Sequence, residues 1–165
     1  MLEASPEDLQ EINGIGPQNI FGIKLAQEIT KEFLKEKIIK KEFCKSAKDV
    51  INYLHSTMNG LKKEVFKVIF LDSSNRILDI EDLFQGTIDK SEIYPREIVK
   101  SAIKHNASAL IFVHNHPSGS SNPSLSDKKI TKDLVSAGKL MDIKILDHII
   151  IGDDTHYSFA NQGEI

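Results

Sequence analysis

Cysteine, tryptophan and long apolar runs are scarce in this sequence. Its 165 residues include one cysteine, Cys44, and no tryptophan. A single cysteine excludes an intramolecular disulfide, so a reducing, cytoplasmic setting is expected. No stretch approaches the roughly 18 apolar residues that a membrane-spanning helix needs. Residues 1–10 are acidic rather than the basic start of a secretory leader, so we expect neither membrane insertion nor export.

The sequence also lacks a strong excess of charge of either sign. Its formal net charge is −3 at pH 7, which gives no overall electrostatic signature of a nucleic-acid-binding protein. With 40% hydrophobic residues, the chain can bury one core built from about 100 to 130 residues and carry a small appendage.

Two histidines separated by one residue follow an apolar run. His114 and His116 come after residues 108–113, where a buried strand would open into a loop of prolines, glycines and serines. Alternate side chains of a strand share a face, so both imidazoles can converge on one point. Asp127 follows, just inside the helical pattern of residues 126–141. Two imidazoles and one carboxylate are the donor set of a catalytic zinc site, whose open fourth position for water indicates hydrolysis.

The wider arrangement is more specific than the histidine pair, which alone would also suit two surface residues of a turn. Five positions carry the pattern: His114, His116, Pro117, Ser124 and Asp127. This series is similar to the signature of the JAMM (MPN-plus) metalloproteases. The run His-Asn-His-Pro-Ser-Gly at residues 114–119, with a later Pro-Ser, resembles the bacterial RadC branch of that family. The resemblance covers about residues 46–165 and implies one Zn²⁺ per chain, held by the two histidines and the aspartate.

Glu64 stands at the start of the apolar run 64–72. A carboxylate there could serve as the base for a metal-activated water, or it could be a plain charge at the edge of a strand. The JAMM resemblance favours the base, because that family supplies its catalytic glutamate from the first strand of the domain. Glu81 and Glu97 are the competing candidates, and both have less apolar surroundings.

Ser124 has three interpretations. In a JAMM-type mechanism, Glu64 takes a proton from water that attacks a peptide or isopeptide carbonyl, and Ser124 donates a hydrogen bond to the oxyanion. Ser124 could instead be a nucleophile, but no base stands at triad spacing. It could also cap the helix that begins near residue 126, a role compatible with the first one. Asn115 and Ser118, beside the ligands, could orient the loop or the water.

A short and a longer helical pattern surround Gly14, Ile15 and Gly16. Ser5 and Pro6 are typical of a helix start, and a second helical pattern runs from residue 17 to about residue 37. Helix, Gly-Ile-Gly, helix resembles the helix-hairpin-helix element, in which backbone amides approach a DNA phosphate and a lysine such as Lys24 lies nearby. Alternatively, this segment is an αα-hairpin that packs on the main domain. RadC-type chains also carry further helical sequence upstream of this point, which this sequence lacks. We therefore expect any DNA contact to be weak and independent of sequence.

The predicted domains are a helix-hairpin-helix-like segment at residues 1–37 and a JAMM-type domain at residues 43–165. Sequence patterns in the second predict a helix with a capping box at residues 46–49 that ends near 59–60, strands at 64–72 and 77–84, a helix at 95–105, a strand at 108–113, a helix at 126–141, and strands at 144–151 and 156–159. Strands alternating with helices predict an α/β fold, a mixed sheet covered on both sides.

The four histidines outside the motif have milder interpretations. His55 and His105 end helices, where a partial positive charge is favourable. His148, beside Asp147 in a strand, either supports a metal ligand or is a satisfied core residue. His156 is expected at the surface.

Two functions remain open. The first is a zinc metallohydrolase acting on an unidentified peptide or protein substrate. The second is a DNA-associated, repair-related module whose zinc domain is a scaffold or acts on nucleic acid. A complete donor set with Glu64 and Ser124 favours the hydrolase, because a scaffold has no need of an open metal position.

Overall fold

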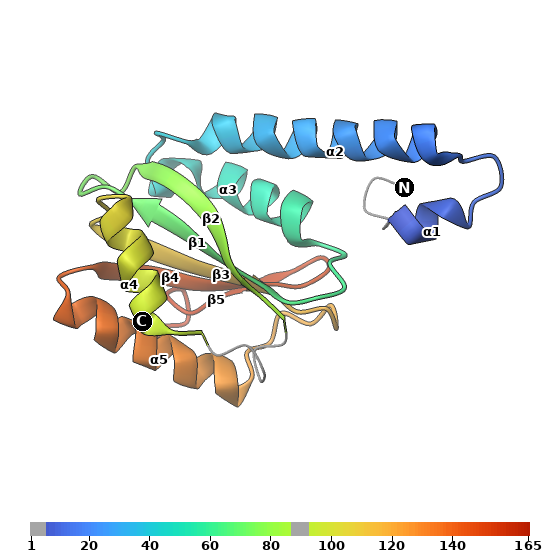
Figure 1. Ribbon diagram of the computed structural model, residues 1–165. Coiled ribbons are helices and arrows are strands. Elements are labelled where there is room, and N and C mark those ends of the chain that lie inside the picture. Colours follow the sequence, from blue (N-terminus) through green and yellow to red (C-terminus); the bar gives the residue numbers. More distant parts are fainter. Residues whose placement is uncertain (1–5, 87–92) are drawn as a thin grey trace.

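The computed structural model describes residues 6–86 and 93–165, and these form a mixed β-sheet with helices on both faces (Figure 1). The elements are α1 (Pro6–Gln10), α2 (Pro17–Ile38), α3 (Phe43–Met58), β1 (Val65–Leu71), β2 (Ile77–Gln85), α4 (Pro95–Lys104), β3 (Ala109–Asn115), α5 (Leu125–Leu140), β4 (Lys144–Ile151) and β5 (His156–Ser158). This architecture confirms the predicted fold class. Ser5, the predicted cap of the first helix, lies outside the described residues. Within them, no helix has both the length and the apolar character needed to cross a membrane.

The five strands follow the order β2-β1-β3-β4-β5 across the sheet. β1 is antiparallel to both β2 and β3, and β4 is antiparallel to β5. β3 and β4 are parallel, and α5 forms the crossover connection that parallel strands require. β3 lies in the middle of the sheet with all its residues buried. Its carboxyl end, next to the start of α5, is therefore a rigid place on which to hold functional side chains.

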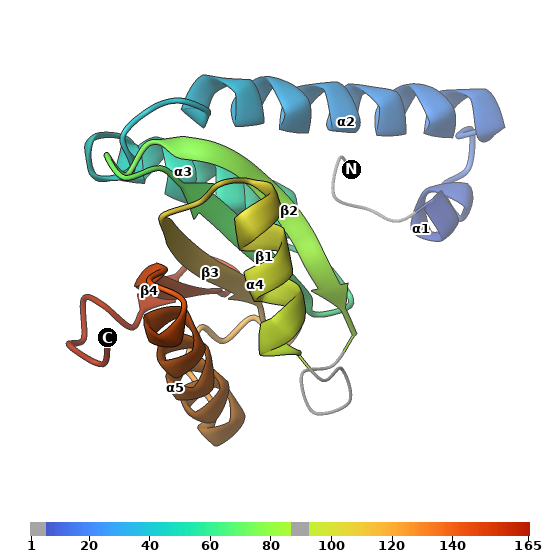
Figure 2. The ribbon, with the colours of Figure 1, turned by 60° about the vertical axis from the view of Figure 1, so that its left-hand side comes forward.

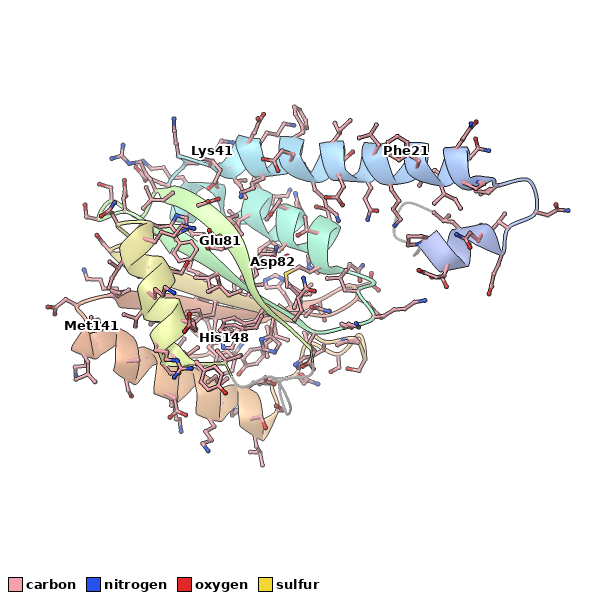
Figure 3. All side chains as sticks on the ribbon, in the orientation of Figure 1. Phe21, Lys41, Glu81, Asp82, Met141 and His148 are labelled. Carbon is pink, nitrogen blue, oxygen red and sulfur yellow. The ribbon has the colours of Figure 1, made fainter. Side chains whose placement is uncertain are left out.

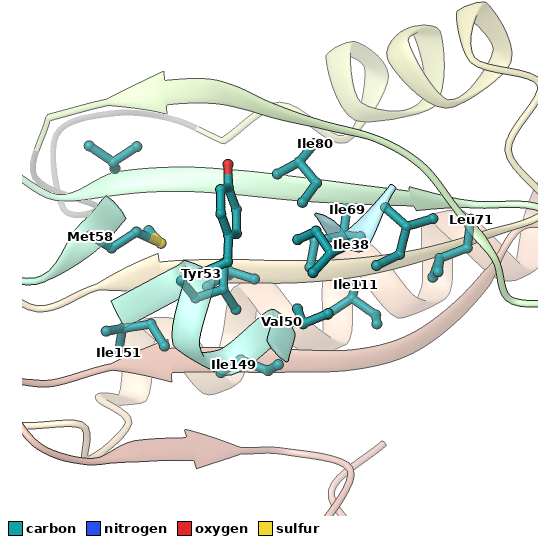
Figure 4. Packing of buried hydrophobic residues seen from close by; sticks show 14 of the residues in the cluster. Ile38, Val50, Tyr53, Met58, Ile69, Leu71, Ile80, Ile111, Ile149 and Ile151 are labelled. Atoms are coloured by element: carbon teal, nitrogen blue, oxygen red, sulfur yellow. The ribbon is translucent and has the colours of Figure 1, made fainter. Parts of the chain in front are cut away.

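Figures 1 and 2 show α3 on one face of the sheet, with α4 and α5 on the other. Successive side chains of the central strands serve opposite faces, so Ile111 joins the core beneath α3 while Phe112 joins the core beneath α4 and α5. Figure 4 shows the first of these cores, where Tyr53 lies among aliphatic side chains. Each fully buried side chain of this kind contributes about 1.5–3 kcal/mol. Burial on both faces explains why residues 65–71, apart from Lys67, are apolar rather than alternating.

α2 lies along α3 and ends in the core, where Ile38 is 1% exposed. Its opposite face carries apolar side chains at every fourth position, which are 48–68% exposed: Phe21, Leu25, Ile29 and Phe33. Phe21 points away from the domain in Figure 3. α1 packs against α2, and its Asp8 Oδ2 pairs with Lys62 Nζ at 2.9 Å. The N-terminal hairpin thus rests on the domain through the inner face of α2 and through this ion pair.

α3 begins at Phe43, before the capping box predicted at residues 46–49. Ser46 has non-helical backbone angles and forms a kink between two helical segments of α3, so the longer segment begins at the predicted position. The Ser46 hydroxyl donates to the Glu42 carbonyl at 2.8 Å. The earlier start has a tertiary cause, because the Phe43 amide donates to the Asn75 carbonyl at 2.9 Å. The turn between β1 and β2 therefore anchors the first residues of the helix.

β3 also extends further than the apolar run predicts, to Asn115. His114 still pairs with Phe66 of β1, and on the other side it pairs with Ile150 of β4. Neighbours on both sides keep the first metal-ligand candidate inside the ladder, so its backbone is fixed by the sheet rather than by the loop.

Candidate metal centre

The structure brings His114, His116 and Asp127 together at the carboxyl end of β3. Their ligand atoms lie within 4.8 Å of one another. His114 Nε2 is 3.0 Å from His116 Nε2 and 3.2 Å from Asp127 Oδ1, and His116 Nε2 is 3.4 Å from Asp127 Oδ2. His114 and Asp127 are buried, whereas His116 is partly exposed. The centre therefore reaches solvent on the side of His116.

A chain of hydrogen bonds sets the tautomer of His114. The Thr131 hydroxyl donates to the backbone carbonyl of Asp127 at 2.6 Å, because a carbonyl can only accept. Its oxygen must then accept from His148 Nδ1, which is also 2.6 Å away. Burial lowers the pKa of His148 well below its usual range, so this ring is neutral and its Nε2 is an acceptor. His148 Nε2 lies 2.9 Å from His114 Nδ1, so His114 carries its proton on Nδ1 and presents the Nε2 lone pair to the centre.

His116 is set in the same way by one contact. Its Nδ1 lies 2.8 Å from the Ser120 carbonyl and must donate to it. The Nε2 lone pair of His116 therefore also faces the centre. A backbone carbonyl in this position is a typical outer partner of a metal-binding histidine.

Two nitrogen lone pairs and a carboxylate thus converge with no donor among them. Burial raises the pKa of Asp127, but the close contacts with His114 and His116 lower it more, and it ends well below its usual range. The close contact with Asp127 in turn raises the pKa of His116. Three acceptors with a negative charge require a cation, either a proton or a metal ion. The donor set fits a divalent metal that accepts both nitrogen and oxygen, such as Zn²⁺.

Ser124 is the N-cap of α5 and forms a capping box with Asp127. Its hydroxyl oxygen accepts from the Asp127 amide at 3.1 Å, while its own amide donates to Asp127 Oδ2 at 2.7 Å. The capping role expected of Ser124 is therefore present, and it also orients the Asp127 carboxylate. An oxygen that accepts one hydrogen bond still carries a hydrogen to donate, so capping leaves an oxyanion role open.

Glu64 lies immediately before β1 and is partly exposed. Burial lowers the pKa of His114, and Glu64 is one of the charges that oppose this effect. After the larger effect of Asp127, the Glu64 carboxylate also adds to the raised pKa of His116. Phe66 pairs with His114 in the ladder, and Glu64 precedes Phe66 by two residues, so strand alternation directs Glu64 to the same face of the sheet as His114.

The competing glutamates are engaged elsewhere. Glu81 accepts from the Ser101 hydroxyl at 2.9 Å, with Lys104 Nζ at 3.3 Å and His105 Nε2 at 2.9 Å. Glu97 lies 3.5 Å from Arg96 Nε. Neither glutamate is among the main influences on the pKa of His114 or His116, and Glu81 and His148 lie well apart in Figure 3.

A second group of possible metal ligands, Asp79, Glu81 and His105, also converges. Here the positive charge is already present, because Lys35 Nζ lies 2.7 Å from Asp79 Oδ1 and Lys104 Nζ lies near Glu81. These contacts make the group an ion-pair network between α2, β2 and α4, and a much poorer metal site than the first.

Comparison with known families covers the part of the chain that contains the first site. The profile of the RadC-like JAB domain matches residues 44–164. The chain belongs to this family. Relatives include UPF0758 proteins of Pseudoalteromonas translucida (43% identical over all of this chain and 74% of the relative), Actinobacillus succinogenes (41% identical over 98% of this chain and 74% of the relative) and a Janthinobacterium species (40% identical over all of this chain and 74% of the relative). The matched region of the RadC-like JAB domain contains all three candidate ligands, Glu64 and Ser124.

The residues proposed for DNA contact lie outside this matched region. Gly14 has a φ of +88°, a conformation that favours glycine, and Gly16 is the N-cap of α2 with no side-chain cap. Gly14 and Gly16 are exposed, and Ile15 is partly buried. Lys24 lies about two turns further along α2, on the face toward the RadC-like JAB domain, and its Nζ donates to Gln27 Oε1 at 2.9 Å. It lines a groove of about 550 Å³ between the hairpin and the domain, apart from the glycine turn.

Thr131 and Ser120 are functional candidates that the sequence reasoning missed. Thr131 follows Asp127 by four residues on α5, so their shared helix face was a signal that could have found it. Ser120 contributes its backbone carbonyl, and the amino-acid sequence cannot indicate this contact because every residue has a carbonyl. His148, by contrast, contacts His114, as one of its two interpretations predicted. His156 is exposed as expected.

Proposed function

We propose that this RadC-like JAB domain is a zinc-dependent metallohydrolase of JAMM type that hydrolyses peptide or isopeptide bonds. The main support is the convergence of two Nε2 lone pairs and one carboxylate, with Glu64 on the same face of the sheet as His114. A zinc ion held by His114, His116 and Asp127 would supply Lewis-acid activation of water and of the scissile carbonyl. The reaction adds water across the amide, so the C–N bond breaks and a carboxylic acid and an amine leave.

The residues of the chain then have separate roles. Glu64 takes the proton from the attacking water and passes it to the leaving amine. Ser124 donates its hydroxyl hydrogen to the oxyanion, a contact whose loss costs about 3 kcal/mol in comparable enzymes. His148 and Thr131 hold His114 in the tautomer that can bind a metal. The substrate is expected to be a cytoplasmic peptide or protein, in keeping with the single cysteine.

Metal analysis and a cleavage assay test this proposal together. We expect the purified protein to contain about one zinc per chain and to cleave members of a peptide library, with cleavage lost after chelation and restored by zinc. His114→Ala/His116→Ala should lose both zinc and cleavage, whereas His156→Ala, at an exposed histidine, should keep both. Full zinc occupancy in the double variant would contradict the ligand assignment. Cleavage that survives complete zinc removal would contradict the proposed chemistry.

A second proposal concerns weak, sequence-independent contact between the N-terminal hairpin and DNA. The observation that favours it is the exposed start of α2, a long helix whose N-cap is Gly16 and whose first turn has no side-chain cap. Such a helix start attracts phosphate through its amides and its dipole.

Replacing Gly16 provides a sharp test, because a Cβ there meets open space and the backbone is extended. Gly16→Asp supplies both a helix cap and a negative charge, so it should preserve the fold and repel phosphate. Duplex DNA binding, measured by fluorescence anisotropy at low salt, should weaken in Gly16→Asp and much less in the neutral control Gly16→Asn. Added salt should weaken the wild-type binding through counterion release. Equal binding by the two variants would mean that this turn does not contact phosphate.

A further inference from the structure

We infer that Asn115, the residue between the two histidines, is a positioning residue that holds Glu64 against the metal centre. The inference rests on the proposed function, because it assigns a role toward the catalytic base. Asn115 is 3% exposed, and strand alternation directs its side chain away from the face that carries His114 and His116. It therefore lies beside the ligands in sequence without pointing at the metal.

The side chain of Asn115 binds the backbone on both sides of Glu64. Its Oδ1 accepts from the Val65 amide at 2.8 Å, and its Nδ2 donates to the Lys63 carbonyl at 3.1 Å. The regular pairing of β1 with β3 starts at Phe66, so these two contacts continue the β1–β3 connection beyond the ladder. On the other side, the Gly86 amide donates to the Glu64 carbonyl at 2.9 Å. Glu64 is thus fixed between the end of β2 and the amide of Asn115.

Only a primary amide provides both halves of this contact. It carries an acceptor and a donor on one short planar group, which matches the donor and acceptor of the backbone around Glu64. An aspartate would place a second acceptor against the Lys63 carbonyl, and a leucine of similar shape would leave both backbone groups unpaired. The side chain at position 115 therefore determines how firmly the segment 63–65 is held.

This matters because a general base acts only within hydrogen-bond reach of its proton. That reach is about 2.6–3.2 Å, and a displacement of about 1 Å costs on the order of 100-fold in rate. Loss of the Asn115 contacts should therefore displace Glu64 and slow hydrolysis, while the three metal ligands stay in place.

The test compares Asn115→Leu and Asn115→Asp with Asn122→Asp, the same chemical change at an exposed position of the metal loop. We expect both Asn115 variants to retain wild-type zinc content, and amide hydrogen exchange at Val65 to rise at least about 10-fold in Asn115→Leu. On a peptide that the wild type cleaves, kcat should fall about 10- to 100-fold with a smaller change in KM. Asn122→Asp should resemble the wild type in all of these measurements.

A double-variant cycle separates positioning from general structural damage. If Asn115 acts through Glu64, adding Asn115→Leu to Glu64→Gln should cause little further loss, because the base is already absent. Losses that multiply would overturn the inference, and so would unchanged exchange at Val65 or loss of zinc in Asn115→Leu. If the wild type cleaves nothing, the proposed function has failed. The exchange and zinc measurements still decide in that case whether Asn115 holds this segment.

Discussion

At the scale of single residues, the proposed function gives Glu64 a role in proton transfer and not in metal binding. Glu64→Gln keeps the size of the side chain and removes the proton acceptor, so we expect zinc content to stay at the wild-type level. Hydrolysis should fall about 100-fold or more, because a general base typically contributes that much. Zinc content by elemental analysis and kcat on a cleaved peptide measure the two effects separately. Loss of zinc in this variant would make Glu64 a ligand, and full activity would exclude it as the base.

Thr131 is predicted to affect metal affinity although it does not touch the metal. Thr131→Val keeps the shape of the side chain but removes the acceptor of His148 Nδ1, so the tautomer of His114 is no longer fixed. Outer contacts of this kind typically change metal affinity about 10- to 100-fold. Competition with a chromophoric chelator should show a loss of this size in Thr131→Val and little loss in Thr131→Ser. Equal affinities of the valine variant and the wild type would refute the tautomer argument.

The convergence of the three candidate ligands could be predicted from sequence because they lie close together along the chain. The alternation of a strand brings His114 and His116 to one face, and the cap of α5 brings Asp127 and Ser124 to the same loop. The supporting contacts are of a different kind. His148 reaches His114 through the parallel pairing of β3 with β4, and no local pattern gives the register of two strands separated by a helix.

At the scale of secondary-structure elements, the start of α5 links stability to the metal centre. Ser124→Ala removes the hydroxyl that caps the Asp127 amide, so we expect the free energy of unfolding to fall by about 1 kcal/mol. Zinc should be retained, while hydrolysis should fall about 100- to 1000-fold if the hydroxyl fully serves the oxyanion. Urea denaturation measures the first effect. Ser136→Ala, at an exposed position of the same helix, is the control and should leave both stability and hydrolysis nearly unchanged.

The helices and strands could be predicted from sequence wherever a single periodicity of apolar residues dominated. Strand β4 has the predicted bounds, because its apolar run ends at Gly152 and an acidic turn. The short segment of α3 before the kink at Ser46 was not predicted, since it depends on the backbone contact of Phe43 with the distant turn at Asn75. The outward row of apolar side chains on α2 was also missed, because the other side of the same helix is apolar where it packs on α3.

At the scale of the whole molecule, the order of the strands determines where the candidate metal centre lies. The mixed sheet has its parallel pair in β3 and β4, and α5 between them begins at the carboxyl end of β3. This topology brings the strand ligands and the helix ligand to one edge, while β1 delivers Glu64 from the neighbouring strand. Composition and periodicity predicted a mixed sheet, but strand order required the long-range pairings of the fold.

The ion-pair network that connects α2 and α4 to β2 predicts how stability depends on pH. Burial raises the pKa of Asp79 and of Glu81, but the contacts with Lys35 and with His105 and Ser101 outweigh this effect, so both pKa values lie below their usual range. Unfolded aspartate and glutamate have pKa values of about 3.9 and 4.3, so the unfolded chain binds protons first as the pH falls. The stabilisation is therefore complete above about pH 5 and is lost as the pH falls through the folded pKa values.

Because the carboxylates are partly exposed, each should contribute less than about 1 kcal/mol. Asp79→Asn/Glu81→Gln should unfold at lower urea than the wild type at about pH 6, and the gap should narrow by about pH 3.5, where these carboxylates of the unfolded wild type are becoming protonated. Glu36→Gln, at an exposed acid on the outer face of α2, should show a small gap that does not depend on pH. A gap in the double variant that stays constant or widens toward acid would mean that these carboxylates do not stabilise the fold through their charge.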